Sequence, residues 1–318
     1  MTIKAALKNL VSRGVLLVTR QAESGLRDRH SVDLVLVAEL RRLDTLSALH
    51  YPVVYVDFLR ACIEAAPHSV KEVKSESHSP GSKANRFSRL LDALQGSMLP
   101  PVEISAAREI ALVADRNSAL TDSFDISHGS WTWAGDVGLH FSLSSSFGSK
   151  GRILYNIIRF MRSERCLELG TAYGMSAFFI LDALEKYAES GHLATIEGAQ
   201  PQFSLSSSVL KARFGASVTC HFGLSNNILP ELFKSPDQFD FIFHDSSHSR
   251  EDYIRDFDQL SQRLAPGSVV LFDDIRWESL KYLAEEPHTY EGWQAVVAHP
   301  RVRRAVEIDD MLGLLFFE

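Results

Sequence analysis

The sequence lacks three features that would place it in a special class: clustered cysteines, a long apolar run and an excess of basic residues. Its three cysteines lie far apart with no C-x-x-C pair, which argues against a cysteine metal site and favours reduced thiols in the cytoplasm. No stretch is long enough to cross a bilayer, and Arg20 follows the short apolar segment 15–18, so we expect neither a membrane partner nor a signal peptide. The net charge of −7 leaves no basic excess for binding phosphates, so we expect no nucleic-acid partner.

The composition is that of a globular protein with roughly two domains. Apolar residues recur three and four apart in much of residues 1–128, which predicts a mainly helical N-terminal domain that shapes a substrate pocket or an oligomer interface. Within it, the Ser-, Lys- and Glu-rich residues 67–85 are predicted to form an exposed loop. Residues 129–150 are rich in Gly, Ser and aromatic residues, and we expect a connecting segment that folds over a pocket.

Residues 151–318 alternate between strand and helix patterns. Such alternation predicts an α/β domain in which helices cover both faces of a parallel sheet. The last two strand patterns are joined by a short turn and suit an antiparallel edge. Strands are predicted at 165–169, 192–197, 217–223, 239–245, 267–274, 304–309 and 313–318.

A glycine turn follows the first of these strands, in the segment RCLELGTAYGMSAFF at 165–179. Gly170 permits a tight reversal with positive φ, and Gly174 would let a ligand approach the backbone closely. The spacing is neither the dinucleotide G-x-G-x-x-G nor a Walker lysine loop, so a pyrophosphate is not expected. The acid before the turn, Glu168, favours an uncharged or cationic ligand instead.

A second acid, Glu197, ends the next strand, from which a carboxylate can accept both hydroxyls of a ribose. Either acid alone could be an ordinary solvated strand end. Because they occur in consecutive strand–helix units, the two together indicate a nucleoside whose amino-acid portion lies over the glycine turn.

These motifs resemble those of class I S-adenosylmethionine-dependent methyltransferases, over about residues 145–318. The resemblance implies a Rossmann-like, seven-stranded methyltransferase sheet whose last strand is antiparallel. It also implies that the first acid, the two glycines and Ser176 line the methionine end, that Glu197 holds the ribose, and that adenine lies near 223–225. The cofactor-binding residues expected from it are Glu168, Gly170, Thr171, Gly174, Ser176, Glu197, Gly198, Gly223, Leu224, Ser225 and Asp245.

Three further acids follow the fourth and fifth strands of this half. Asp245 ends the segment FDFIFHD, and Asp273 and Asp274 end VVLFDD. Carboxylates from adjacent strand ends form a hard oxygen site that suits Mg²⁺, which could polarise a substrate hydroxyl. His248 lies three residues after the first acid and could accept the hydroxyl proton as a general base.

This block resembles the metal-dependent O-methyltransferases of the catechol type, and more closely the macrocin and mycinamicin sugar O-methyltransferases, in which D-x-x-H precedes a paired acidic motif. The resemblance implies Asp245, Asp273 and Asp274 as metal ligands and His248 as the base. The catechol enzymes have lysine at the base position and an Asp-Asn pair in place of the two adjacent acids. Trp277 and Arg276, which follow directly, are candidate substrate contacts.

Simpler interpretations remain for the same residues. Adjacent acids often cap a turn, and His248 could be an exposed residue at a helix start, where Ser249 and Asp252 fit a capping box. Asp245 is useful at a cofactor site with or without a metal. An arginine such as Arg276 is more often a surface residue, and a tryptophan such as Trp277 more often fills a core.

The functional hypothesis is a small-molecule methyltransferase that methylates a hydroxyl in specialised metabolism, as a homodimer. One alternative keeps the cofactor but needs no metal, as in N- or carboxyl methylation or another reaction at the sulfonium centre. Another is a scaffold that binds the cofactor without catalysis.

Overall fold

The computed structural model describes residues 69–76, 82–95, 124–128, 131–135, 149–276, 288–309 and 311–317. The helical pattern expected before residue 69 and over 96–123 lies outside these residues. Within the described ranges no helix has the length and hydropathy needed to cross a membrane.

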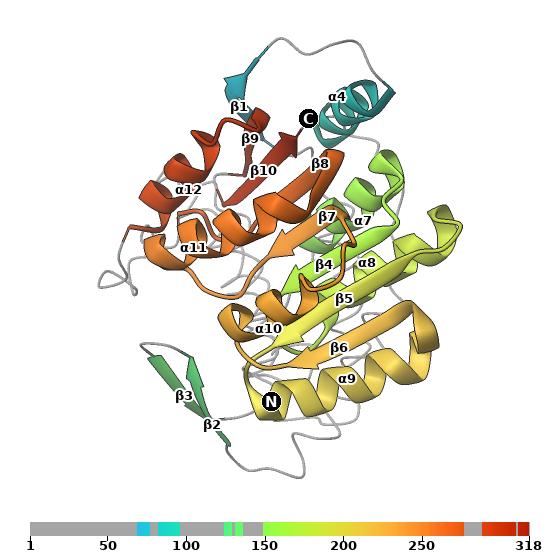
Figure 1. Ribbon diagram of the computed structural model, residues 1–318, viewed down its shortest axis with the longest axis vertical. Helices are drawn as coiled ribbons and strands as arrows, with labels where there is room; N and C mark the ends of the chain where they lie inside the picture. Colours follow the sequence, from blue (N-terminus) through green and yellow to red (C-terminus); the bar gives the residue numbers. More distant parts are fainter. Residues whose placement is uncertain are drawn as a thin grey trace, which may run out of the picture.

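The main sheet has eight strands in the order β1-β9-β10-β8-β7-β4-β5-β6 (Figure 1). The five strands β4 to β8 are parallel to one another, whereas β10 runs antiparallel to both β8 and β9. The predicted methyltransferase-like sheet with its antiparallel last strand is therefore confirmed, with one strand more. The strands are β1 Val70–Ser75, β4 Arg165–Leu169, β5 His192–Glu197, β6 Val218–Phe222, β7 Phe239–His244, β8 Leu264–Phe272, β9 Val302–Ile308 and β10 Leu312–Phe317.

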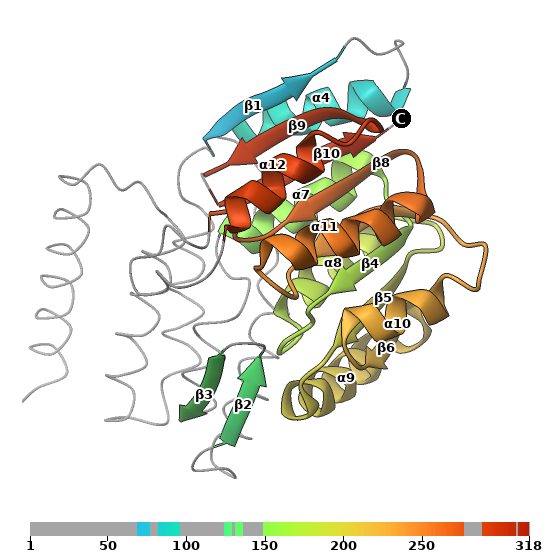
Figure 2. The ribbon, with the colours of Figure 1, turned by 60° about the vertical axis from the view of Figure 1, so that its left-hand side comes forward.

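Helices cover both faces of the sheet, as the alternation predicts. Side chains from α4, α7, α8 and α9 form one apolar cluster with alternate strand residues, and α10, α11 and α12 form the other with the residues between. Figure 2 shows α10, α11 and α12 in front of the sheet, with α4, α7 and α8 behind it. The helices are α4 Ser82–Gln95, α7 Ser149–Met161, α8 Met175–Tyr187, α9 Gln200–Phe214, α10 Ser225–Leu232, α11 Arg250–Leu260 and α12 Thr289–Val297.

The prediction of an exposed loop over 67–85 was wrong. Strand β1 lies within it and pairs antiparallel with β9 at the edge of the main sheet, and α4 begins at Ser82. The strand was missed because its Lys and Glu side chains are mostly exposed, as is common on an edge strand. Helix α4 buries Phe87, Leu90 and Leu94 in the core beside α7.

A separate hairpin, β2 Phe124–His128 with β3 Trp131–Gly135, spans the predicted boundary at residue 128 and stands apart from the main sheet (Figure 1).

The register of the central strands brings the candidate site together. Leu169 of β4 is paired with His244 of β7, which is paired in turn with Phe272 of β8. The residue after each therefore lies at the same edge. Backbone hydrogen bonds continue one step further, from Asp245 N to Leu169 O (2.8 Å) and from Asp273 N to His244 O (2.9 Å). This edge carries the carboxyl ends of parallel strands, where α/β sheets bind ligands.

Candidate functional site

The glycine turn after β4 depends on a missing side chain at Gly170. This residue has φ of +90°, and a Cβ there would lie 2.0 Å from the carbonyl oxygen of Asp245. Gly170 thus lets the loops after β4 and β7 touch. Gly174, with φ of +86°, is the N-cap of α8, but a Cβ there would meet Ser206 at 3.2 Å and Leu210 at 3.4 Å. The close approach at Gly174 is therefore made by helix α9.

Glu168 lies beneath this turn, fully buried, and does not project from the strand end. The hydroxyls of Ser176 and Thr195 donate to its two carboxylate oxygens, each at 2.5 Å, and Thr171 is hydrogen-bonded to Thr195. Burial raises the pKa of Glu168 to about 7, despite the two hydroxyl donors that lower it. The predicted residues Glu168, Thr171 and Ser176 are thus brought together, joined by Thr195, which the sequence analysis did not identify.

The raised pKa makes the folding stability dependent on pH. Between pH 4.5, the ordinary pKa value, and about 7 the folded protein keeps a proton that the unfolded chain has lost, so stability falls as pH rises. Between pH 4.5 and 8 the ionisation of Glu168 should lower the free energy of unfolding of wild type by about 3 kcal/mol. We expect this decrease to be absent in Glu168→Gln. Denaturant unfolding at both pH values would measure it. The exposed Glu231→Gln is the control, and an equal pH dependence in Glu168→Gln and wild type would contradict the expectation.

Glu197 connects the turn to the next helix. Its carboxylate accepts the backbone N–H of Ala172 at 2.6 Å and that of Ala199 at 2.7 Å. Burial raises its pKa, although these backbone donors oppose the shift. Each oxygen accepts one of these bonds and keeps acceptor capacity for a further donor such as a hydroxyl.

An apolar surface lies beside Glu197, at the end of β6. Phe222 and Leu224 are 48% and 59% exposed, whereas most large apolar side chains in the described part of the chain are buried. The backbone N–H of Gly223, between them, donates to the carbonyl of Glu197 at 2.9 Å. The expected adenine segment 223–225 therefore lies beside the expected ribose residue. The Ser225 hydroxyl, however, donates to Asp256 at 3.1 Å.

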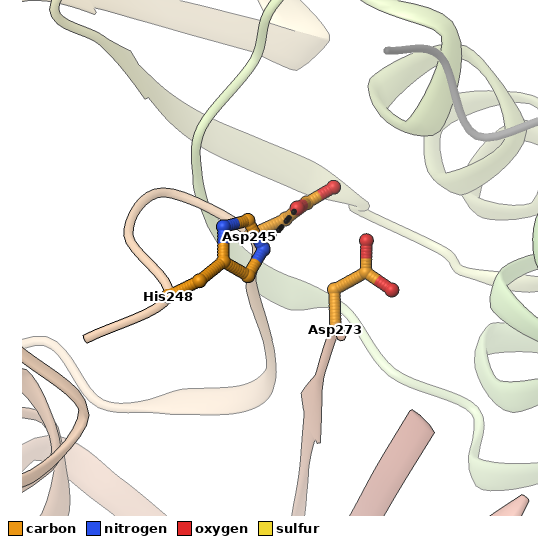
Figure 3. Close-up of side chains that lie close together, drawn as sticks. All are labelled: Asp245, His248 and Asp273. Carbon is orange, nitrogen blue, oxygen red and sulfur yellow. Dashed lines mark ion pairs between the residues drawn. The ribbon is translucent and has the colours of Figure 1, made fainter. Parts of the chain in front are cut away.

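Acids from two strand ends and one histidine form a cluster at the edge of the sheet (Figure 3). His248 Nε2 lies 3.6 Å from Asp245 Oδ1 and 3.5 Å from Asp274 Oδ2. Asp273 projects from the end of β8 into the same space. Asp245, His248 and Asp273 offer ligand atoms within 4.8 Å of one another, and the two carboxylates among them suit a divalent cation. Asp274 lies outside this set of three and contacts the cluster through His248.

The surroundings within the cluster raise the pKa values of both Asp245 and His248. Burial raises the pKa of Asp245 well above its ordinary value, and the nearby Asp273 carboxylate raises it further. Burial alone would lower the pKa of His248, but the hydrogen bond with Asp245 and the charge of Asp274 raise it. His248 therefore lies where carboxylates stabilise an imidazolium.

The loop that holds His248 is fixed where it enters α11. Ser249 is the N-cap of α11 and accepts a hydrogen bond from the Asp252 backbone N–H at 3.1 Å, which confirms the predicted cap. The Thr289 hydroxyl donates to the His248 carbonyl at 3.0 Å. The side chain of His248 is 20% exposed and faces the acids, so it is more than an exposed residue at a helix start.

Sequence reasoning missed Lys150, near the start of α7. Its side chain is 8% exposed, and its Nζ donates to Asp273 Oδ2. It lies within the segment 129–150 that was expected to be a connection. The predicted cluster of acids was the one signal that could have pointed to a lysine, because buried carboxylates need a cation nearby. A buried pair was also missed, His244 with Asp256, whose atoms Nε2 and Oδ2 are 3.2 Å apart.

Of the two residues predicted to contact substrate, the structure describes only Arg276. The Arg276 guanidinium donates to Glu307 at 2.8 Å and stacks over Tyr290, with its Cζ 3.8 Å from the ring centroid. It is thus held by the protein's own acid. Trp277 lies outside the described residues.

Residues 167–275 match the family model described as a methyltransferase domain. No curated protein matches the sequence.

Solved structures with the same fold include three S-adenosylmethionine-related complexes. An O-methyltransferase from Bacillus cereus in complex with SAH has 19% identity and a TM-score of 0.50, over 69% of this chain and 93% of that one. TomG from Streptomyces achromogenes, an O-methyltransferase involved in tomaymycin synthesis and bound to SAM, has 20% identity and a TM-score of 0.50, over 75% and 100%. The SAH-bound methyltransferase PaMTH1 from Podospora anserina has 14% identity and a TM-score of 0.51, over 76% and 99%.

Proposed function

Because residues 167–275 match a methyltransferase domain and the fold is shared with solved O-methyltransferases bound to SAM or SAH, we propose that the chain is a class I S-adenosylmethionine-dependent methyltransferase that methylates a hydroxyl group of a small molecule. The observation that supports this most is the cluster of Asp245, His248 and Asp273 directly beside the glycine turn, where Gly170 touches Asp245. A base and a hard oxygen site at that place suit an acceptor that must lose a proton. The O-methyltransferase relatives, one of them involved in tomaymycin synthesis, support a role in specialised metabolism.

The residues of the first two strand ends suit the cofactor. S-adenosylmethionine, when bound, supplies a methyl group on a positively charged sulfur. The N-terminus of α8, at Gly174, favours the carboxylate of a methionine portion. Glu197 keeps acceptor capacity for ribose hydroxyls, and the exposed Phe222 and Leu224 offer apolar surface to a flat base.

The acceptor would be activated by the acids and the histidine. Asp245 and Asp273 would hold Mg²⁺, which would supply a Lewis acid that lowers the pKa of a substrate hydroxyl. His248 takes the hydroxyl proton, and the carboxylates of Asp245 and Asp274 stabilise the imidazolium that results. Positioning supplies the remaining rate acceleration, because the turn that would bind the methyl donor contacts, at Gly170, the loop that would activate the acceptor.

A transfer assay tests the proposal. The protein would be incubated with S-adenosylmethionine and a panel of phenols, sugar-bearing macrolides, amines and carboxylic acids, and methylated products identified by mass spectrometry. We expect O-methylated products from hydroxyl acceptors. Cofactor binding measured by calorimetry, with no transfer to any acceptor, would favour a silent scaffold instead.

Removal of divalent ions is expected to lower the rate of hydroxyl methylation at least about tenfold, because the Lewis acid that lowers the hydroxyl pKa is lost. Rates after EDTA treatment, and after Mg²⁺ is added back, would measure it. The cofactor dissociation constant, which should not change, is the control. Full activity in the chelator would point to a metal-independent reaction such as carboxyl methylation.

A further inference from the structure

We propose that Lys150 is a built-in counter-ion of the carboxylate cluster and competes with a divalent cation for Asp273, so that it sets the metal affinity of the site. The proposal rests on the proposed metal-assisted function and adds to it a residue that weakens metal binding. Lys150 comes from α7, which precedes the first strand of the parallel sheet, whereas every other member of the cluster follows a strand.

Lys150 is buried in a way that lysines rarely are unless they are paired. Its ammonium is bound to Asp273 Oδ2, and the charges of Asp274 and Asp245 attract it as well. The side chains of the pair are 8% and 1% exposed. The protein therefore keeps a fixed positive charge against the carboxylate that a metal would use.

The geometry leaves little distance between this ammonium and a bound metal. The ligand atoms of Asp245, His248 and Asp273 lie within 4.8 Å of one another, and Lys150 contacts an oxygen of one of these three residues. Two cations that share one carboxylate repel each other strongly where water is largely excluded. A divalent ion must therefore enter against the ammonium, and the site should bind metal more weakly than the same three ligand residues would without Lys150.

A purely orienting role for Lys150 predicts the opposite. A residue that only holds a ligand in place lowers metal affinity when it is removed, typically by ten- to a hundredfold. Competition raises affinity on removal. The direction of the change therefore decides between the two roles.

Metal titration of the full chain tests the proposal without reference to activity. Binding of Mn²⁺ and Mg²⁺ would be measured by calorimetry for wild type, Lys150→Met, Lys150→Gln and Lys150→Arg, with the exposed Lys211→Met as control. We expect both neutral variants to bind at least about tenfold more tightly than wild type. Lys150→Arg keeps the charge, so it and the control should stay within about threefold of wild type.

Thermal unfolding provides a second readout. Loss of the ammonium leaves buried acids uncompensated, so the neutral variants should melt lower than wild type without metal and gain more from added Mn²⁺. Equal or weaker metal binding by both neutral variants would overturn the proposal, as would absence of metal binding by every protein tested. Failure of the proposed function is seen separately, as absence of methyl transfer from S-adenosylmethionine to hydroxyl acceptors.

Discussion

Asp245→Asn is expected to lower kcat/KM for methyl transfer at least about a thousandfold, because general-base catalysis alone is worth roughly 10²–10⁴ and this carboxylate also belongs to the candidate metal set. Asparagine keeps the shape of the side chain but removes its negative charge. His248, 3.6 Å away, then loses one of the two carboxylates that stabilise its charged form. Steady-state rates with S-adenosylmethionine and a hydroxyl acceptor would measure the loss.

The fold should survive this substitution. Burial raises the pKa of Asp245 well above its ordinary value, so its charge costs stability and an amide costs less. The melting temperature of Asp245→Asn should equal or exceed that of wild type. Asp258→Asn, on the exposed side of α11, is the matched control and should retain wild-type kcat/KM. If kcat/KM of Asp245→Asn stayed within tenfold of wild type, the chemistry would have to lie elsewhere.

The position of the acids at the strand ends could be predicted because parallel strands end at the same edge of a sheet. A strand pattern that ends in an acid places it at the carboxyl edge, and neighbouring strands bring their acids to the same edge. Asp245 and Asp273 follow paired residues of β7 and β8, which is why the two predictions converged. Helix periodicity and the capping residue Ser249 likewise depend on local sequence alone.

The partners of those acids could not be predicted in the same way. Lys150 reaches Asp273 across 123 positions of sequence, and β1 joins β9 across more than 220. Neither contact leaves a local periodic pattern, and β1 reads as a loop because its exposed residues are Lys and Glu. Such pairings are decided by how the sheet and its covering helices pack.

Glu168 shows a third reason why a site residue is difficult to interpret from the sequence alone. An acid in an apolar strand can be an exposed ligand group or a buried one held by hydroxyl groups. Its donors, Ser176 and Thr195, come from a helix and a neighbouring strand, so only the assembled sheet reveals them. The sequence predicts that Glu168 matters to the turn, and the structure shows that it acts from beneath it.

His248→Gln is expected to lower kcat for methylation of a hydroxyl by roughly 10²–10⁴ while the dissociation constant of S-adenosylmethionine stays the same. Glutamine retains polar atoms at the head of the loop but cannot take up a proton. The loop itself should remain in place, because Ser249 caps α11 and Thr289 binds the carbonyl of residue 248, not its side chain. Single-turnover rates and cofactor calorimetry would separate the chemical step from binding.

The acceptor decides what an unchanged rate would mean. A carboxylate is already deprotonated and needs no base, so a carboxyl methyltransferase would keep its rate in His248→Gln and in chelator alike. A hydroxyl methyltransferase should lose rate in both experiments. His221→Gln, on β6 and remote from the acids, is the matched control and should keep the wild-type rate. Equal turnover by His248→Gln and this control would therefore refute His248 as the base, and with it hydroxyl methylation at this cluster.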